Sequence, residues 1–570
     1  MKKWVVKRSY GANKSQGDVS WGDSGDIISA LLQNRGIGDE EKEEFLNPPS
    51  IAKYLKKMSA DFKKSLKKAR EEILNAVKQN QPIIIHGDYD ADGICATAIL
   101  YKTLTQTLEY NKVAYFIPNR FDQGYGLSME SVGEMIKLTK ERFGVSGGLV
   151  VTVDCGITAE DAVVQLAHEQ GFKLLITDHH RKKESDPRVE VILWTDSMVG
   201  AGIALVLAVI LGLSEDRLIS LAGIATVTDL ASLKGFNRVL VKKSLEILNS
   251  NPPQGIKSLI TVSGRNNGEI SVYDLGYVIG PRLNASGRLD SAYDSLKLLL
   301  EDNEADIVKI AQKLNAVNIE RQEMTQKMYE LAESLEISHS DKVIVVASSE
   351  FHEGVIGLVA GKLAQKYYKP VIVISINGEM AKGSARSVLG VNIIEMLRHF
   401  EDRFTGLGGH PMAAGFSIKK ENLEQFTTDF IKYTQEAISE ELLVPQLNID
   451  LEIPLSLINA NLFKEIAQLK PYGIGNPEPL FLSRNVGVAS SDFVGKGDSH
   501  LSLKLFDRQN MYKAILFDAK NLGVLGFDLG TKIDIVYTAS SKEFNGKPSL
   551  DIIIKDYASS TPSTLYPSSS

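Results

Sequence analysis

The sequence reads Ile83-Ile84-Ile85-His86-Gly87-Asp88-Tyr89-Asp90-Ala91-Asp92-Gly93 early in the chain. The apolar, β-branched start predicts a buried strand, and the turn after it carries a histidine and three aspartates at alternating positions. Carboxylates crowded at one strand end repel each other, and they stay ionised together only when a cation lies among them. The segment therefore favours a metal site, although on its own it would more often be an acidic surface turn.

Three later segments repeat this arrangement. Residues 149–156 form an apolar run that ends in Asp154, residues 174–180 end in Asp178-His179-His180, and residues 222–229 end in Asp229. Short apolar runs that alternate with helix-length segments are typical of βαβ units and a parallel sheet. Ligand sites in such sheets lie at the carboxyl ends of the strands. We therefore expect four strands to bring these side chains to one edge.

The residue types indicate which metals and which reaction to expect. Mixed histidine and aspartate ligands suit Mn²⁺, Mg²⁺, Zn²⁺ or Fe²⁺, and the two cysteines, Cys95 and Cys155, are too few for a closed structural zinc site or a disulfide framework. One ion takes about four to six ligands, and at least six candidates converge here, so two ions are plausible. Two ions roughly 4 Å apart clamp the attacking and leaving oxygens of a phosphoryl transfer. Phosphoester hydrolysis is the leading chemistry.

The four segments together carry a family resemblance. His86-x-x-x-Asp90-x-Asp92, then Asp154, then Asp178-His179-His180, then Asp229 resemble the four motifs of the DHH phosphoesterase superfamily. Within it, residues from about 20 to about 555 resemble the RecJ family of single-strand-specific 5′-to-3′ DNA exonucleases. The sequence departs from the family pattern in two places: the segment between His180 and Gly202 is short, and the fourth motif continues after Asp229 as Leu-Ala-Ser. Both departures affect the expected shape of the substrate channel near Asp229.

The resemblance implies two divalent metal ions, Mn²⁺ or Mg²⁺, as cofactors. The residues that would bind them are His86, Asp90, Asp92, Asp154, His179 and Asp229. In this assignment Asp154 bridges the two ions, with His86 and Asp90 on the first ion only.

The same resemblance implies roles for three further residues. Asp178 would orient a neighbouring group, and His180 would hydrogen-bond the scissile phosphate or protonate the leaving oxygen. Asp88 is the third candidate catalytic residue, with a less defined role. The implied products are nucleoside 5′-monophosphates.

Substrate contacts are expected from arginines and glycine-rich segments. Arg120 lies in a glycine and aromatic loop, and residues 280–289 place two arginines in a glycine-flanked loop. Clustered glycines let backbone amides approach an anion, although a loop with a packed histidine is the alternative for Gly-Gly-His. The resemblance implies phosphate binding by Arg120, Arg282, Arg288, Ser384, Arg386, Gly408, Gly409 and His410.

The fold class expected is α/β and multidomain. A parallel-sheet DHH catalytic domain covers 78–250, and a helical connector covers 251–340, with one long connecting helix at 295–335. A second α/β domain, the DHH-associated domain, covers 341–440, and five short alternating strands within 445–556 predict a C-terminal OB-type β-barrel. Residues 1–77 are predicted to form an N-terminal helical segment and 557–570, rich in Ser, Thr and Pro, a disordered tail.

Composition limits the location and the partners. The chain has 570 residues and a net charge of −7, which offers no global attraction to nucleic acid. The longest apolar run, 199–213, is too short to span a bilayer and predicts a buried helix, so we expect a cytoplasmic protein without membrane contact. The resemblance implies single-stranded DNA as partner, with single-strand-binding protein and a RecQ-type helicase as further candidates.

Two other functions stay open at this stage. One is a DHH-family phosphodiesterase for short oligonucleotides or cyclic dinucleotides, which would have no use for a long DNA-binding track. The other is a non-catalytic scaffold that binds single-stranded DNA, although crowded carboxylates would be costly without metal.

Overall fold

The computed structural model describes residues 2–8, 24–119, 123–213, 215–265, 268–289, 291–335, 337–338, 340–508, 510–544 and 547–559. Arg120 and residues 560–570 of the predicted tail lie outside these ranges. The chain divides into two units. The larger unit contains Ser50–Ala231 and Val239–Pro445, and the smaller one contains Met1–Pro49, Ser232–Arg238 and Gln446–Ser570.

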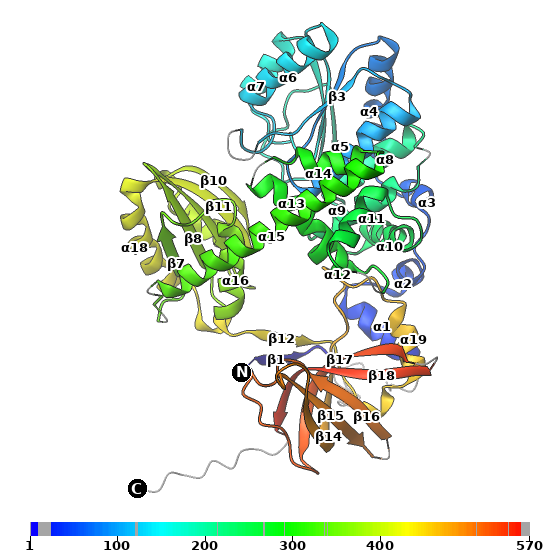
Figure 1. The fold of residues 1–570 in the computed structure, drawn as a ribbon, viewed down its shortest axis with the longest axis vertical. Helices are drawn as coiled ribbons and strands as arrows, with labels where there is room; N and C mark the ends of the chain where they lie inside the picture. Colours follow the sequence, from blue (N-terminus) through cyan, green and yellow to red (C-terminus); the bar gives the residue numbers. More distant parts are fainter. Residues whose placement is uncertain are drawn as a thin grey trace. The chain divides into compact units, whose positions relative to one another are not determined.

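A five-stranded parallel sheet forms the first part of the larger unit (Figure 1). Its strands are β2 (Ile83–His86), β3 (Val113–Phe116), β4 (Gly148–Val153), β5 (Phe172–Asp178) and β6 (Val191–Trp194), in the order β3-β2-β4-β5-β6. Every residue of β2 is buried, as expected for a strand covered on both faces. The predicted parallel sheet is confirmed, and the carboxyl ends of β2, β4 and β5 lie side by side because these strands pair in that order.

Several helical segments precede, separate and follow these strands in the chain. They are α3 (Ile51–Leu55), α4 (Ala60–Lys78), α5 (Ala91–Lys102), the π-helix η1 (Thr103–Thr107), α6 (Met129–Phe143), α7 (Asp161–Glu169), α8 (Gly200–Ile210), α9 (Leu218–Thr228) and α10 (Gly235–Ser250). Helix α8 is the buried helix predicted within 199–213, and it is buried through Ala208.

The fourth predicted strand, at 222–228, is wrong, because these residues belong to helix α9. A short apolar run cannot be assigned to strand or helix by periodicity when it is buried on all sides. The run begins upstream at Leu218 and reaches helix length, and α9 packs against α5 and α8. Asp229 therefore follows a helix rather than a strand.

The segment between the two sheets is helical, as predicted. It contains α11 (Gln254–Val262), α12 (Val272–Asp274), the π-helix η2 (Leu275–Ile279), α13 (Gly280–Leu289), α14 (Tyr293–Leu300) and α15 (Glu304–Ser334). The predicted glycine-flanked loop at 280–289 is wrong: these residues form α13, with Pro281 in its first turn. The helix predicted at 295–335 is two helices, since Asn303 caps a new helix by accepting hydrogen bonds from the amides of Ala305 and Asp306.

A mixed five-stranded sheet forms the second part of the larger unit. Its strands are β7 (Ile344–Ser348), β8 (Val371–Asn377), β9 (Met380–Arg386), β10 (Phe404–His410) and β11 (Ala413–Lys419), in the order β10-β11-β9-β8-β7. Four helices accompany it: α16 (Ile356–Tyr367), α17 (Ile393–Arg398), the 3₁₀ helix η3 (Glu401–Arg403) and α18 (Lys420–Ala437).

The glycine-rich segments of this sheet lie mainly on strands. Gly383 is in the middle of β9, and Gly406–His410 lie on β10. The Phe416 ring occupies the space that a Cβ at Gly383 would need, so this glycine serves close packing across the sheet rather than a turn.

The smaller unit contains the predicted barrel. All five predicted strands are present, as parts of β14 (Phe481–Val494), β15 (His500–Asp507), β16 (Asn510–Leu516), β17 (Lys532–Phe544) and β18 (Lys547–Ser559). Pairing of β14 with β17 closes the barrel, which confirms the OB-type prediction. The other elements are β1 (Lys3–Val6), α1 (Ser24–Asn34), α2 (Asp39–Leu46), the 3₁₀ helices η4 (Glu440–Leu443, at the end of the larger unit) and η5 (Leu455–Leu457), β12 (Gln446–Ile449), β13 (Leu451–Glu452) and α19 (Ala460–Ala467). None of the described helices is both long and apolar enough to cross a membrane.

Candidate active site

The turn after β2 is shaped by helix capping and by one glycine. Asp90 is the N-cap of α5 and accepts hydrogen bonds from the amides of Asp92, at 2.8 Å, and Gly93, at 3.2 Å. A Cβ at Gly93 would lie 2.5 Å from the Asp88 amide nitrogen, so only glycine lets this turn fold back on itself. Asp88 and Asp92 are buried by this turn.

Asp154 follows β4 in a strained conformation. Its φ is +64°, which is uncommon for a residue other than glycine and is typically retained at functional positions. Its amide donates to the Thr177 carbonyl on β5, at 3.0 Å. A Cβ at Gly200 would lie 2.5 Å from the Asp154 Cβ, so the glycine at the start of α8 makes room for this side chain.

The start of α8 also holds Asp92. The amide of Gly200 donates to Asp92 Oδ2, and that of Ala201 donates to Oδ1, both at 2.7 Å. Amides at a helix N-terminus favour negative charge. One helix end therefore stabilises a carboxylate in a cluster that is otherwise acidic.

Asp178 orients the two histidines that follow it. Its Oδ1 accepts from the amides of His179, at 2.7 Å, and His180, at 3.0 Å, and lies 2.8 Å from His180 Nδ1. Its Oδ2 accepts from the Ile157 amide at 2.9 Å. Both carboxylate oxygens are occupied by these contacts, which suits the predicted orienting role better than metal binding.

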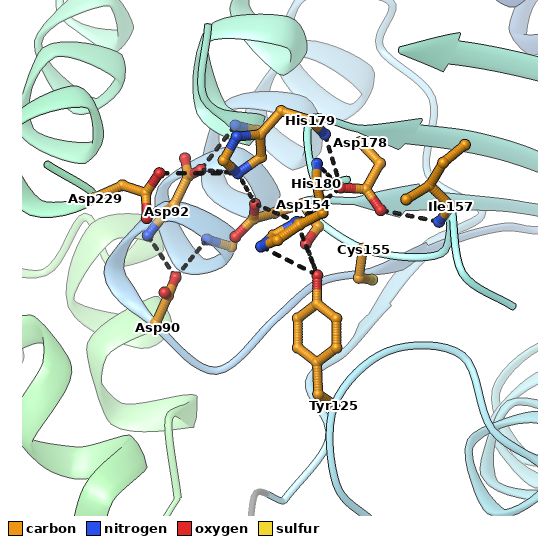
Figure 2. Close-up of polar contacts among 12 residues, drawn as sticks. Asp90, Asp92, Tyr125, Asp154, Cys155, Ile157, Asp178, His179, His180 and Asp229 are labelled. Carbon is orange, nitrogen blue, oxygen red and sulfur yellow. Dashed lines mark hydrogen bonds and ion pairs between the residues drawn. The ribbon is translucent and has the colours of Figure 1, made fainter. Parts of the chain in front are cut away.

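The ligand atoms converge on His179, at the centre of the cluster (Figure 2). His179 Nε2 lies 3.0 Å from Asp154 Oδ1, 3.6 Å from Asp92 Oδ2 and 3.9 Å from Asp229 Oδ2. The approach to Asp154 lacks hydrogen-bond geometry, so both atoms remain available to a metal. In the described part of the chain, three sets of ligand atoms lie within 4.8 Å of one another: Asp154, His179 and His180; Asp92, His179 and Asp229; Asp88, Asp90 and Asp154.

His86 stands apart from these three sets. Its Nε2 is buried and has no hydrogen-bond partner within the described ranges, and its Nδ1 lies 3.5 Å from Cys155 Sγ. Burial lowers the pKa of His86 to about 4, so the imidazole is neutral at pH 7, the form that binds metal. Asp88, whose catalytic role stays a prediction, lies among the candidate ligands, with Asp90 and Asp154.

The electrostatics of the cluster fit a divalent cation. Burial raises the pKa of Asp92 and Asp154, and for Asp154 the surrounding carboxylates raise it further. Partial burial and the charges of Asp92 and Asp90 raise the pKa of Asp229 to about 8. Carboxylates that resist ionisation together, beside the buried and unpartnered nitrogens of His86 and His179, form a donor set for Mn²⁺ or Mg²⁺.

His180 differs from the other two histidines. Burial lowers its pKa, but the hydrogen bond and the charge of Asp178 outweigh burial and raise it to about 9. His180 therefore carries a proton at neutral pH and can donate it to a phosphate or to a leaving oxygen.

Five of the predicted substrate residues gather at one end of the β9-β11-β10 sheet. His410 pairs with Ala413, which pairs with Arg386, and Gly408 pairs with Gly415, which pairs with Ser384. Gly409 lies between the two rows. Arg386 Nη1 donates to Ser384 Oγ at 3.2 Å, and a Cβ at Gly357 in α16 would lie 2.8 Å from Arg386 Nη2.

Of the other predicted arginines, Arg282 has contacts that direct it away from both groups. Arg282 on α13 donates from Nε to Asn315 Oδ1, at 2.9 Å, and from Nη1 to the Val278 carbonyl, at 2.7 Å, so it faces α15 and not the metal cluster. Arg288 lies near the end of α13, where its carbonyl approaches Gly354 just before α16. Arg120 lies outside the described residues.

Sequence reasoning missed two residues that contact the site. Tyr125 donates to the Asp154 carbonyl at 3.0 Å, and its Oη lies 2.9 Å from His180 Nδ1. Its position between Gly124 and Gly126, both with positive φ, was a signal of a tightly turned loop. Asn284 on α13 accepts from the Ala91 amide at 2.8 Å, a long-range contact that no local pattern announces.

Comparison with known proteins places this arrangement in a class. Three family models match: the DHH family N-terminal domain over residues 82–231, the DHHA1 domain over 340–436 and the RecJ OB domain over 449–556. Fold and site thus define a DHH protein with a DHHA1 domain and an OB barrel.

Individual relatives narrow the class. The single-stranded-DNA-specific exonuclease RecJ of Bacillus subtilis (strain 168) is 33% identical over 93% of this chain and 68% of its own length. The protein of the same name from Escherichia coli (strain K12) is 31% identical over 86% of this chain and 89% of its own. A crystal structure of RecJ in complex with Mn²⁺ from Thermus thermophilus matches with a TM-score of 0.79 and 27% identity, over 98% of this chain and 79% of that chain. The chain therefore belongs to the RecJ family.

Proposed function

We propose that the chain is a single-stranded-DNA-specific exonuclease that hydrolyses phosphodiesters from the 5′ end and releases nucleoside 5′-monophosphates. The observation that carries the proposal is the buried His and Asp cluster at the sheet edge, in which His86 Nε2, Asp154 Oδ1 and His179 Nε2 have no hydrogen-bond partner among the described residues. Relatives named as single-stranded-DNA-specific exonucleases align over most of the chain, which supports the substrate class.

Two divalent ions, Mn²⁺ or Mg²⁺, are the proposed cofactors. His86, Asp90 and Asp154 would hold one, with Asp88 as an added candidate, and Asp92, Asp154, His179 and Asp229 would hold the other. When bound, the ions would activate water and neutralise charge on the phosphoryl group.

The chain's own residues would position and protonate the substrate. Asp178 keeps His180 oriented and charged, and the protonated His180 would donate to the scissile phosphate or to the leaving oxygen. Ser384, Arg386 and His410, with the amides of Gly408 and Gly409, would bind the 5′-terminal phosphate. Substrate contacts by Arg120, Arg282 and Arg288 stay predictions.

The barrel of the smaller unit is proposed to bind the single strand that trails from the site, through stacking and backbone contacts. A cytoplasmic location, the partners single-strand-binding protein and RecQ-type helicase, and the domain boundaries predicted from the sequence also stay predictions. A single-stranded substrate agrees with the net charge of −7 only if basic groups are concentrated locally.

The test uses an oligonucleotide labelled at its 3′ end, as single strand and as blunt duplex, with Mn²⁺ or Mg²⁺. We expect a shrinking ladder from the single strand and an intact duplex, with Asp154→Ala inactive but folded. Turnover of dinucleotides with no degradation of the longer strand would favour the small-substrate phosphodiesterase. Binding without any hydrolysis in the metal-loaded protein would favour the scaffold.

A further inference from the structure

Helix α15 carries a polar interruption in its packed stripe. Residues spaced alternately by four and three turn toward the body of the protein: Ile307, Ala311, Leu314, Asn318, Arg321, Thr325, Met328 and Ala332. Apolar residues occupy both ends of this stripe, and α15 packs on α11, α13, α14 and α16. Its middle is polar, a pattern that apolar packing alone does not explain.

Two of these middle side chains have buried polar atoms without hydrogen-bond partners among the described residues. Asn318 is fully buried, and neither its amide nitrogen nor its amide oxygen has a partner in the described part of the chain. Arg321 Nε is likewise buried and unpartnered there. Buried polar groups are almost always satisfied, so such a pair indicates a missing ligand.

A second arginine adds positive charge at the same place. Arg282 reaches α15 through its hydrogen bond to Asn315, one turn before Asn318. Among the described residues, neither Arg282 nor Arg321 forms an ion pair with a carboxylate. Burial lowers the pKa of both guanidinium groups, and the charge of Arg282 lowers that of Arg321 further. Two neighbouring, partly buried cations without an anion repel each other, at a cost that water only partly screens.

We propose that Arg282, Asn318 and Arg321 form a binding site for a phosphate group. Guanidinium groups offer planar donors that match phosphate oxygens, and the Asn318 amide adds a neutral donor. A water molecule could satisfy the amide, but it would not neutralise the two charges.

The proposed site is separate from the metal cluster, but helix α13 contacts both. Asn284 on this helix binds the Ala91 amide at the start of α5, whereas Arg282, two residues earlier, reaches α15. Residues two apart lie on different sides of a helix about 10 Å across. The phosphate would come either from the DNA backbone, beyond the cleaved bond, or from free phosphate in solution. The DNA source rests on the proposed function, and the free source does not.

The experiment uses the full chain in EDTA, so that no cleavage occurs. The variants are Arg321→Met and Asn318→Leu, with Lys327→Met as a matched control that removes an exposed charge from the same helix. Melting is followed in phosphate-free buffer and with inorganic phosphate, and binding of a 5′-phosphorylated oligothymidylate is titrated at several salt concentrations.

Two results support the site and separate the sources. If DNA supplies the phosphate, Arg321→Met weakens oligothymidylate binding about tenfold and reduces the salt slope by about 0.7, while Lys327→Met stays within about twofold. If free phosphate fills the site, inorganic phosphate stabilises the wild type more than Arg321→Met, and DNA affinity is unchanged. In both cases Arg321→Met melts no lower than the wild type without phosphate, since the repulsion between two partly buried cations is gone.

The proposal is overturned if neither phosphate nor DNA distinguishes Arg321→Met from the control, because the site then holds only water. It is also overturned if Arg321→Met and Asn318→Leu both melt lower and respond normally to both ligands, because the residues are then structural. Failure of the wild type to degrade single strands with Mn²⁺ would reject the proposed function and leave the inorganic phosphate result standing.

Discussion

The two sheets of the larger unit end in opposite chemistry. The parallel sheet ends in carboxylates and imidazoles that are mostly buried, whereas the mixed sheet ends in Gly408, Gly409 and His410, which are exposed, beside Arg386. Buried like charges are costly, so the first edge is incomplete without cations. The second edge has no buried like charges, so it is stable without a bound anion. A phosphodiester needs both, because metals act on its oxygens and a cationic pocket fixes its end.

The largest expected effect comes from removing the carboxylate at the centre of the first edge. Asp154→Asn should lower the hydrolysis rate by roughly a thousandfold or more, because a shared ligand is lost. The metal-free protein should be no less stable at pH 7, since burial and neighbouring carboxylates already raise the pKa of Asp154. Rate, bound Mn²⁺ and melting are measured, with Asp161→Asn on α7 as control. Near-normal hydrolysis in Asp154→Asn would remove Asp154 from the site.

A smaller effect is expected from crowding the same carboxylate through its neighbour. Gly200→Ala should cost about a hundredfold in rate, because the new Cβ would lie 2.5 Å from the Asp154 Cβ and displace it. Gly133→Ala on α6 is the matched control, since its Cβ meets nothing within 4 Å. The measurement is the rate at saturating Mn²⁺. Equal rates in the two variants would show that the cluster tolerates displacement.

Metal removal should make stability depend on pH at the first edge. The pKa of Asp229 is about 8 in the folded protein against 3.8 as its ordinary value, and the pKa values of Asp92 and Asp154 are also raised. A raised carboxyl pKa gives stability that is present below about pH 4 and lost as the pH rises toward 8. Metal-free protein should therefore weaken between pH 5 and 8.

Mn²⁺ at a hundred times its Kd should add about 2.7 kcal/mol, and less at pH 5, where protons compete for the ligands. Urea denaturation at both pH values, with EDTA or with Mn²⁺, checks this. The same pH slope with and without metal would contradict the assignment of these carboxylates.

A substitution at the second edge should change the affinity for DNA and leave the amount of bound metal unchanged. Arg386→Ala should weaken binding of 5′-phosphorylated single strands about tenfold, because a charge-assisted hydrogen bond is lost. Against a 5′-hydroxyl strand the variant and the wild type should bind alike, and bound Mn²⁺ should be unchanged. Arg398→Ala, an exposed arginine paired with Glu395, is the control. An equal loss on both strands would mean that Arg386 does not contact the terminal phosphate.

The chemistry of these edges could be read from the sequence better than the elements that carry it. The metal motifs lie at fixed spacings after apolar runs, and the pairing of β2, β4 and β5 places His86, Asp154 and His179 at the same edge of the sheet, as expected for consecutive parallel strands. Helices α9 and α13 were misassigned because buried apolar runs and glycine-proline pairs are ambiguous locally.

Contacts between distant segments could not be predicted at all. The Gly200 amide donates a hydrogen bond to Asp92, and the Ala91 amide donates one to Asn284. Each of these bonds joins segments more than a hundred residues apart. Neither contact leaves a periodic signal, because each depends on how two helices meet. The polar middle of α15 is similar, since Asn318 and Arg321 fit an ordinary helix pattern until their burial is known.

The smallest expected effect concerns Tyr125, which binds the strained Asp154 backbone and lies beside His180. Tyr125→Phe should lower kcat about three- to tenfold with little change in KM, because neutral hydrogen bonds contribute modestly. Asp178, not Tyr125, raises the pKa of His180 to about 9, so the basic limb of the pH profile should stay in place. Asp178→Asn should instead move that limb toward lower pH. If Tyr125→Phe moved the basic limb as far as Asp178→Asn does, Tyr125 would control the protonation of His180. The assignment of that role to Asp178 would then be wrong.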